Sequence, residues 1–539
     1  MAPFRVIIIG GSVSGLTLAN ALEQYGIDFV VLEKYEIAPD IGAGLAIWPH
    51  GARILDQLGC HDAIVKFNEP VNTITTYDVN GNHRGEFPEA GAWFEEIFRY
   101  KMRFMERRQT VQAIYDNLRD KTKVHAYSAV VKIECRSDGV SVETDDGSVF
   151  HGDIIVGADG VRSSIRNEMQ RLASDETPGR ILFPTKESFH HTYRGLFGTS
   201  RMPKGMMRQD EASRSFGSDR SYLAAGGPDG ILYWIIFAKN DEPAQGTSFP
   251  HFTEAEAQEL IARYADDFIR PGVRFGDVIK HQIKSSLVPI EEGVLKTCFY
   301  RRMVLLGDSW HKSNPVTGLN GNSCINSAAT LADELECFAR REPSPDEARI
   351  EKAFLAYQQS REQQARVAAN LSHAMQKADA MATPLHKIFQ LYLLPKIPME
   401  VFVSRVAYLM SLGVRMKHLP IPSKPGMHLY DDEVKLKPKS RSRLASMAWI
   451  SLLVFATVWL YPLQKLEFDR VHLHGEHTRE SYFFMSINLE QEQMYQLLDQ
   501  LRISVVMLIM CIESYRRFFF MSILGRYVFR FSVHSQPGN

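Results

Sequence analysis

Unbroken apolar runs and an amphipathic stretch follow one another at the start of the chain. Residues 5–10 read RVIIIG, residues 16–26 read LTLANALEQYG with an apolar stripe, and residues 28–33 read DFVVLE. A short apolar run is typical of a strand buried on both faces of a parallel sheet, whereas the stretch between the runs has the period of a helix. The pattern predicts strand, helix and strand, with the helix ending at Gly26.

The turn before this helix is rich in glycine and reads GGSVSG. Gly10 permits a tight turn, Gly15 lets the helix pack closely on the strand, and the helix amino terminus offers free N–H groups to a pyrophosphate. Glu33 ends the second strand, where an acid typically binds a ribose hydroxyl. Ser12 replaces the usual middle glycine, but its hydroxyl can donate to the same phosphate. We predict a site for FAD or NAD rather than NADP; the alternative is a glycine-rich turn of another α/β protein.

Two further segments have the same order of strand, turn and helix. Residues 152–166 read GDIIVGADGVRSSIR. Within residues 302–335, Asp308 directly follows an apolar strand and precedes a long helix. A carboxylate at a strand end can accept hydrogen bonds from a ribityl chain, and the positive end of the next helix would stabilise reduced flavin, which is an anion. These segments favour FAD, although each alone is also compatible with an ordinary strand-to-helix crossover.

Three stretches within residues 181–284, at residues 190–200, 221–238 and 273–283, alternate apolar and polar side chains between Gly-Pro and Asp-Gly turns. Such alternation is typical of strands with two different faces, so we expect a β-sheet here, with residues 273–283 (VRFGDVIKHQI) among its strands. We expect helices over residues 336–425, and a basic linker follows at residues 426–443.

Composition changes this picture little. The 539 residues are too many for one ordinary domain, and a hydrophobic content of 45% is enough for a large core. The 62 Lys and Arg residues are balanced by 63 Asp and Glu residues, so nothing indicates nucleic-acid binding. The six cysteines form no CxxC pair, which predicts a reducing compartment and no metal site. We expect no secretory signal peptide, because the first strand begins almost at once.

The carboxyl-terminal part has a different character. Residues 444–463 are 20 residues without a charge, long enough to cross a bilayer, and basic side chains precede them. We predict a transmembrane helix that leaves the preceding domains in the cytosol; the alternative is a buried helix of a soluble domain. Residues 503–525 are interrupted by charges and favour an interfacial helix. Three histidines in between are interpreted as part of a solvated loop rather than a metal site: His472, His474 and His477.

In order and spacing, the three nucleotide segments resemble the FAD-dependent monooxygenases of the para-hydroxybenzoate hydroxylase type over residues 1–425. Four blocks are similar to fungal meroterpenoid and indole-diterpene (paxilline-type) epoxidases: APDIGAGLAIWPHGARILDQLG (38–59), FMERRQTVQAIYDNL (104–118), GDSWHKSNPVTG (307–318) and ATPLHKIFQLYLLP (382–395). The resemblance implies a Rossmann-like FAD-binding domain of residues 1–180 and 285–335, with the β-rich substrate domain of residues 181–284 inserted into it.

The resemblance also implies which residues bind FAD. Glu33 would bind the adenosine ribose, and Asp308 would bind the ribityl or pyrophosphate part. An arginine at the head of the helix in residues 107–118 would reach FAD; Arg107 is favoured, with Arg108 as the alternative. The implied cofactor-binding residues are Gly10, Gly15, Glu33, Ala46, Arg107, Asp308 and Gly321.

Two of these residues would lie against the cofactor itself. Ala46, or its neighbour Gly44, would contact it after the second strand, and Gly321 would let the last helix approach the isoalloxazine ring. The chain departs from the family pattern twice, with Asn320 at a glycine position and Ser327 near a position where an acid is common. We expect these differences to alter flavin mobility or reoxidation without removing the site.

The substrate would lie between the flavin and the predicted sheet. Arg194 is the candidate to orient a polar group or to assist peroxide chemistry, and Tyr222 is the candidate proton donor. Trp234 is a further candidate for the pocket. The alternative for Tyr222 and Trp234 is cross-strand packing without a catalytic role.

The resemblance implies an oxidoreductase that uses FAD, NADPH and O2. We expect it to epoxidise a terminal prenyl alkene of a meroterpenoid or related terpenoid through a flavin C4a-hydroperoxide in a dry pocket. A membrane-bound terpene cyclase would then use the epoxide, and the enzyme would be anchored to a membrane, with the endoplasmic reticulum expected. The alternatives are an aromatic hydroxylase, a reductase of isoprenoid double bonds and a non-catalytic prenyl-binding escort of the same fold.

Overall fold

The computed structural model describes residues 3–40, 44–184, 189–203, 205–246, 250–339, 345–396 and 406–422, together with residues 424, 430 and 432. Residues 1–397 and 409–434 form one compact unit, and the fold below is that unit's. The predicted segments 444–463 and 503–525 and the three histidines between them lie outside the described residues. Among the described residues, no helix combines the length and the apolar character needed to cross a membrane.

The first three predicted elements are confirmed. Strand β1 (Arg5–Ile9) and strand β2 (Asp28–Leu32) pair in parallel, and helix α1 (Val13–Tyr25) joins them. The helix ends at Gly26, which takes the left-handed conformation with φ 68°. Because the strands are apolar on both faces, they lie at the centre of the sheet and are almost fully buried.

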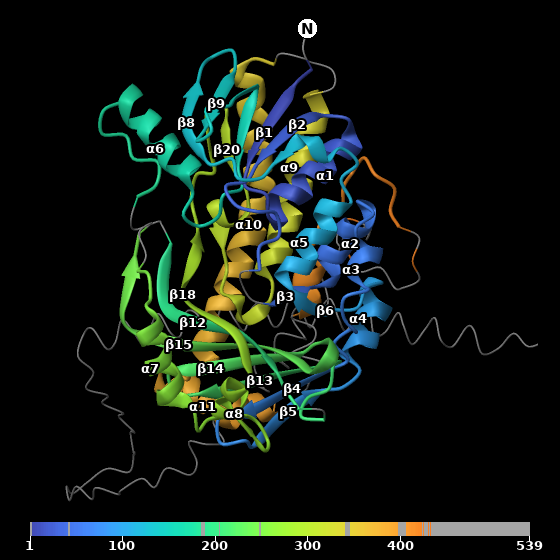
Figure 1. Ribbon diagram of the computed structural model, residues 1–539, viewed down its shortest axis with the longest axis vertical. Coiled ribbons are helices and arrows are strands. Elements are labelled where there is room, and N and C mark those ends of the chain that lie inside the picture. The colour runs from blue at the N-terminus through green and yellow to red at the C-terminus, as the bar shows by residue number, and fades with distance from the viewer. Residues whose placement is uncertain are drawn as a thin grey trace, which may run out of the picture. The chain divides into compact units, whose positions relative to one another are not determined.

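These strands belong to a six-stranded sheet that carries the nucleotide segments. Its spatial order is β19 (Phe299–Tyr300), β20 (Met303–Leu305), β11 (Ile154–Gly157), β1, β2 and β7 (Val124–His125). All neighbouring pairs are parallel except β19 with β20. Helix α9 (Asn320–Ala339) packs against α1 beside the sheet (Figure 1), so the segments that contain Glu33 and Asp308 approach one another.

An eight-stranded sheet forms the lower half of the view in Figure 1. Its spatial order is β21 (His311–Lys312), β18 (Gln282–Val294), β12 (His190–Arg201), β15 (Ile231–Gln245), β14 (Arg220–Gly226), β13 (Glu211–Gly217), β4 (Thr73–Asp78) and β5 (His83–Phe87). One face packs on α7 (Glu254–Tyr264) and α8 (Phe275–Lys280), and the other packs on η5 (Pro315–Thr317) and α10 (Glu347–Asp379).

The structure corrects two details of the predicted sheet. Strands β4 and β5 join it, although the predicted boundaries assign them to residues 1–180; β4 pairs in parallel with β13. Most of the predicted strand at residues 273–283 is helix α8, which begins where the Arg274 N–H donates to Asp277 Oδ2 at 3.2 Å. Phe275 and Val278 are both buried, so the stretch has a helical as well as an alternating pattern.

The remaining elements are helices and smaller sheets. A two-stranded ribbon of β3 (Gly44–Ile47) and β6 (Arg103–Glu106) leads into α5 (Arg107–Asp116). Helix α10 passes from α9 to the eight-stranded sheet (Figure 1). The other elements are α2 (Pro49–Gln57), α3 (His61–Ile64), α4 (Ala90–Phe98), η1 (Lys121–Lys123), β8 (Val130–Cys135), β9 (Val140–Thr144), β10 (Val149–Gly152), α6 (Ser164–Glu176), η3 (Pro228–Gly230), β16 (Phe268–Arg270), β17 (Val273–Arg274), η4 (Gly307–Ser309), α11 (Pro384–Ile388), η6 (Phe389–Leu393) and η7 (Leu394–Lys396).

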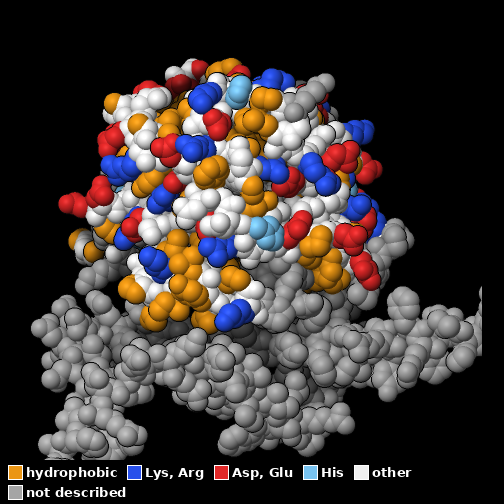
Figure 2. All heavy atoms as spheres, turned by 90° about the horizontal axis from the view of Figure 1, so that it is seen from below, with side chains coloured by type: hydrophobic (Ala, Val, Ile, Leu, Met, Phe, Trp, Pro, Cys, Tyr) orange, Lys and Arg blue, Asp and Glu red, His pale blue; other side chains and the backbone are white. Residues whose placement is uncertain are grey.

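The end of the molecule at which α11 lies carries exposed apolar side chains. Leu385, Ile388 and Tyr392 are 45%, 50% and 63% exposed. Figure 2 views the molecule from this end and shows hydrophobic side chains gathered beside basic ones, with both signs of charge interspersed elsewhere on the face. Large apolar side chains that remain exposed together are typical of a contact surface.

Candidate FAD and substrate site

The glycine-rich turn adopts the geometry that its sequence predicts. Gly10 has φ +111°, and a Cβ on it would lie 2.4 Å from the Ala158 carbonyl oxygen. A Cβ on Gly15 would lie 1.9 Å from the Gly10 carbonyl oxygen. Both positions therefore require glycine, the first for the turn and the second for the close approach of α1 to β1.

The amino terminus of α1 is suited to an anion. Ser12 is the N-cap residue, but within the described structure its side chain does not cap the helix, and the first turn contains no acid. The Ser12 hydroxyl instead accepts a hydrogen bond from Arg107 Nη2 at 2.7 Å. The backbone N–H groups of the first turn and the Arg107 guanidinium thus face the same place, which fits the pyrophosphate of a dinucleotide.

Glu33 lies beside this turn, as predicted. The Gly11 N–H donates to Glu33 Oε2 at 2.7 Å, and the Tyr35 N–H donates to Oε1 at 3.0 Å. These two bonds fix the carboxylate at the end of β2. Each carboxylate oxygen has a second lone pair, so the group can still accept from a ribose hydroxyl.

We expect Arg107→Ala to weaken FAD binding by about tenfold or more, because a charge-assisted hydrogen bond to phosphate contributes about 1.5–3 kcal/mol. Arg108→Ala is the matched control, since Arg108 points to Asp40 at 4.0 Å rather than to Ser12. Titration of FAD-free protein with FAD, followed by flavin fluorescence, measures both dissociation constants. A larger loss for Arg108→Ala would assign the contact to Arg108 instead.

Asp308 lies in η4, directly after β20, and its carboxylate is oriented by α9. Asn320 Nδ2 donates to Asp308 Oδ1 at 2.8 Å, and Cys324 Sγ lies 3.3 Å from the same oxygen. Burial, and then the nearby Asp308 charge, raise the pKa of the Cys324 thiol, so it keeps its proton and acts as a donor. Asn320 therefore holds the predicted cofactor acid in place.

Asn322 was missed by the sequence analysis and joins three parts of the site. This fully buried side chain donates from Nδ2 to the carbonyl oxygens of Ala46 and Gly318, at 2.8 and 3.0 Å. Its Oδ1 accepts from the Trp48 N–H at 2.9 Å. Asn322 thus connects α9, the β3 ribbon and the end of η5. No sequence period marks such a residue, because its partners are distant along the chain.

The two residues predicted to lie against the cofactor meet at this junction. Ala46 is 5% exposed, and a Cβ on Gly321 would lie 2.6 Å from Leu45 Cδ1, so glycine brings α9 against β3. Trp48 Nε1 is buried and has no hydrogen-bond partner among the described residues. A buried donor without a partner is costly in a finished core but suitable in a site that receives a polar ligand.

Ser327, the second position expected to depart from the family pattern, also makes polar contacts. Ser327 Oγ lies 2.8 Å from His311 Nε2 and accepts from Arg361 Nε at 3.3 Å. Burial, together with the nearby Arg361 charge, lowers the pKa of His311 to about 3, so this imidazole is neutral. These contacts join α9, β21 and α10 behind the Asp308 loop.

The structure does not bring Tyr222 and Trp234 to the face of the sheet that meets η5. The Tyr222 hydroxyl donates to Asp267 Oδ2 at 2.7 Å, and Trp234 Nε1 donates to Ser200 Oγ at 2.9 Å. Both rings pack on Phe275 of α8. Burial, and then Asp267, raise the pKa of Tyr222 well above its usual value, so its proton is retained. These contacts agree with the alternative interpretation, in which Tyr222 and Trp234 are packing residues.

Arg194 also points to the α7–α8 face. Its strand partner Ala238 belongs to the core on that face, and its guanidinium lies 5.9 Å from the centre of the Phe252 ring. Arg194 Nε is buried without a hydrogen-bond partner in the described part of the chain. The orientation places this arginine across the sheet from η5, so the contact with peroxide chemistry predicted for it has no geometric support.

The face towards η5 is formed by other residues. Tyr193, one position before Arg194, lies there, and its buried hydroxyl has no partner among the described residues. Successive residues of a strand point to opposite faces of the sheet, so the neighbouring residues Tyr193 and Arg194 lie on opposite faces. The buried members of this apolar face are Tyr193, Ile235, Phe237, Ile290, Val316 and Ala380.

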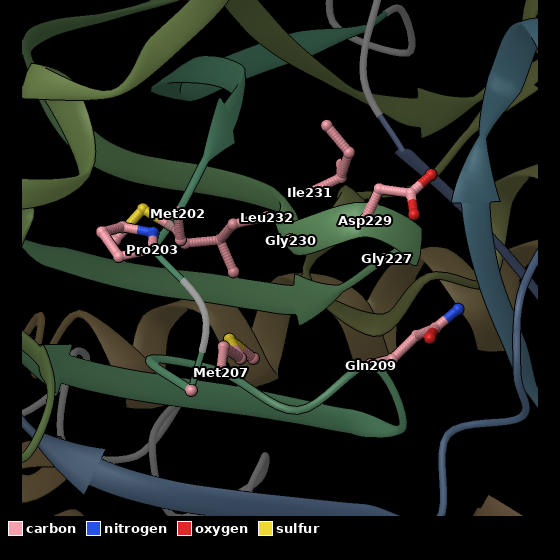
Figure 3. Close-up of a pocket in the computed structure, with 10 residues that line it drawn as sticks. Met202, Pro203, Met207, Gln209, Gly227, Asp229, Gly230, Ile231 and Leu232 are labelled. Atoms are coloured by element: carbon pink, nitrogen blue, oxygen red, sulfur yellow. The ribbon is translucent and has the colours of Figure 1, made fainter.

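A pocket of about 200 Å³ lies at one end of the eight-stranded sheet (Figure 3). Met202, Pro203 and Met207 line it from the β12–β13 connection, and residues 229–232 line it from the end of the β14–β15 connection and the start of β15. Of the described residues that line it, none is a predicted cofactor-binding residue. This pocket is therefore separate from the junction around Asn322.

Comparisons with known proteins agree with this geometry. A family model described as "FAD binding domain" matches residues 4–178. The FAD-dependent monooxygenase asqG of Emericella nidulans is 32% identical over 497 residues, which are 90% of this chain and 88% of that protein. The FAD-dependent monooxygenase olcE of Penicillium canescens is 34% identical over 78% of this chain and 91% of its own length.

Other relatives are longer than this chain. The chain covers 62% of the FAD-dependent monooxygenase atnA of Arthrinium sp, to which it is 34% identical over 470 residues. Among solved structures, Klebsiella pneumoniae HpxO complexed with FAD and uric acid superposes with a TM-score of 0.61 at 20% identity, covering 76% of this chain and 97% of that one. The native structure of FqzB gives a TM-score of 0.58 at 18% identity, covering 76% and 94%. These likenesses concern the fold.

Proposed function

This chain belongs to the family of FAD-dependent monooxygenases, and from that membership we propose that it oxidises a hydrophobic prenylated substrate in fungal secondary metabolism. The proposed reaction is epoxidation of a terminal prenyl alkene, with NADPH as the electron donor. One atom of O2 enters the alkene as the epoxide oxygen, and the other leaves as water, which takes up the hydride of NADPH and one proton as NADPH becomes NADP+. Membership of the family supports a monooxygenation, and the apolar face of the eight-stranded sheet supports the proposed substrate class.

The residues at the turn and the junction fit FAD. The free amides of α1 and Arg107 would hold the pyrophosphate, Glu33 would hold the adenosine ribose, and Asp308 would bind the ribityl chain. When bound, FAD supplies the redox chemistry that activates O2. The protein itself has to orient the ring, exclude water and place the substrate.

The observation that carries the substrate class is the apolar face of the eight-stranded sheet. Ile235, Phe237 and Ile290 lie on it, and Val316 of η5 packs against them. An apolar wall excludes water and favours a hydrocarbon chain over a polar ring. Tyr193 supplies a hydroxyl at this face, which is suited to a hydrogen bond with a polar head group.

Two other functions are compatible with the same fold. A phenol hydroxylase would favour a small polar pocket, which the apolar face does not resemble. A prenyl-binding escort would not need the predicted cofactor-binding residues Glu33, Arg107 and Asp308, and it would be colourless after purification. The yellow colour of bound flavin therefore separates the enzyme from the escort.

We also propose that the enzyme is anchored to a membrane with its catalytic domain in the cytosol. The uncharged residues 444–463 and the basic residues before them support this proposal, as do the exposed side chains of Leu385, Ile388 and Tyr392. Prenylated intermediates partition into bilayers, so an anchored enzyme would meet its substrate there. A membrane-bound terpene cyclase is the class of enzyme that would consume the epoxide.

The decisive experiment supplies membranes containing the protein with NADPH, ¹⁸O2 and a farnesylated or geranylgeranylated aromatic compound. We expect one ¹⁸O atom in an epoxide on the prenyl chain, detected by mass spectrometry, and no product when NADPH is omitted. Label on the aromatic ring would instead establish the hydroxylase. Reduction of a double bond without uptake of label would establish the reductase.

A further inference from the structure

A nearly buried lysine lies beside the predicted FAD acid. Lys312 belongs to β21, which pairs with the end of β18 through Gly293. Its Nζ donates to Glu291 Oε2 at 2.6 Å and lies 4.0 Å from Asp308 Oδ2. The side chains of Lys312 and Glu291 are 20% and 5% exposed. A buried ion pair of this kind is expensive to desolvate, so it is weak evidence for a purely stabilising role.

The groups around Lys312 determine its charge and show which other charged residues lie near it. Burial disfavours its ammonium, but Glu291 and Asp308 outweigh this effect and raise the pKa of Lys312, so it is charged at neutral pH. Arg107 opposes that charge from nearby. Because Arg107 contacts Ser12 of the glycine-rich turn, Lys312 belongs to the same group of charged residues as Arg107 and Asp308 beside this turn.

We propose that Lys312 is a cofactor-binding residue whose ammonium, held by Glu291 beside Asp308, favours the reduced and more negative form of FAD. The inference rests on the proposed FAD site and adds a residue that tunes it. A positive charge beside the bound cofactor would stabilise a negative charge that develops on it, and partial burial strengthens such an effect relative to water. Glu291 both positions the ammonium and partly cancels its field.

The test compares how tightly the full chain binds reduced and oxidised FAD, measured by spectrophotometric redox titration. Lys312→Met removes the charge at similar length and is expected to reduce the preference for reduced FAD by about tenfold. Glu291→Gln removes the opposing charge and is expected to increase that preference. Lys312→Arg keeps the charge and should stay near the native ratio. The opposite signs matter, because a structural disturbance alone would not produce them.

The exposed pair Lys239 and Asp219, whose charged groups are 3.2 Å apart, provides the control. Lys239→Met and Asp219→Asn should leave the ratio unchanged. The proposal is overturned if Lys312→Met and Glu291→Gln bind FAD with an unchanged ratio or shift it in the same direction. If Lys312→Met does not fold, Glu291→Gln decides alone, and no increase overturns the proposal. Failure of the native protein to bind FAD would instead reject the proposed function itself.

Discussion

Asp308→Ala is expected to yield folded protein without bound FAD. The carboxylate is held ready by Asn320 and Cys324, whose donor atoms lie 2.8 and 3.3 Å from Oδ1. A hydrogen bond to a charged group contributes about 1.5–3 kcal/mol, so the loss of two to the ribityl chain would weaken binding by about 100-fold or more. The absorbance of the purified protein near the flavin bands measures the loss.

Two companion variants make this result specific. Asp308→Asn keeps an oxygen that can accept from Asn320 and should retain part of the affinity. Asp219→Ala changes a surface acid whose side chain is 57% exposed, and it should keep all of the flavin. Circular dichroism of each variant controls for folding. Full flavin content in Asp308→Ala would refute the role assigned to this carboxylate.

The nucleotide half of the protein was predictable because its signals are local. An apolar run, a glycine-rich turn and an amphipathic pattern each occupy a few consecutive residues, and each predicts one structural element. Glu33 and Asp308 follow strands of one parallel sheet, so their approach to a common edge follows from topology. Arg107 was chosen over Arg108 by spacing within a helix, and its contact with Ser12 agrees with that choice.

The substrate half was less predictable for a physical reason. Alternation along β12 shows that Tyr193 and Arg194 point to opposite faces, but it does not say which face meets η5. Arg194 and Tyr222 were the catalytic candidates because their side chains are polar, yet the structure places both on the α7–α8 face. Similarly, β4 joins β13 from over 130 residues away, and no local pattern specifies that pairing.

Polar residues that connect distant segments are the other group that the sequence did not reveal. Asn322 binds backbone atoms of residues 46, 48 and 318, and Lys312 pairs with Glu291 on another strand. Asn322 lies at a helix start and Lys312 on a two-residue strand, and at such positions no period distinguishes them from ordinary polar positions. Only the three-dimensional arrangement shows that Asn320 supports Asp308.

Gly15→Ala is expected to damage both stability and FAD binding. Its new Cβ would lie 1.9 Å from the Gly10 carbonyl oxygen and 3.2 Å from Ile8 Cγ2. The nearest atom belongs to the backbone of the turn, so no side-chain rotation relieves the contact and α1 has to move away from β1. Overpacking costs typically 1–3 kcal/mol, and a backbone collision belongs at the upper end. We therefore expect about 3 kcal/mol less stability in urea unfolding.

Displacement of α1 also moves the amides that would hold the pyrophosphate, so FAD affinity should fall by at least about tenfold. Gly85→Ala in β5 is the matched control, because within the described structure nothing lies within 4 Å of the added Cβ. It should change the unfolding free energy by no more than about 0.5 kcal/mol. If Gly15→Ala matched Gly85→Ala in both measurements, α1 would tolerate a wider spacing from β1, and the close approach would not be what shapes the phosphate site.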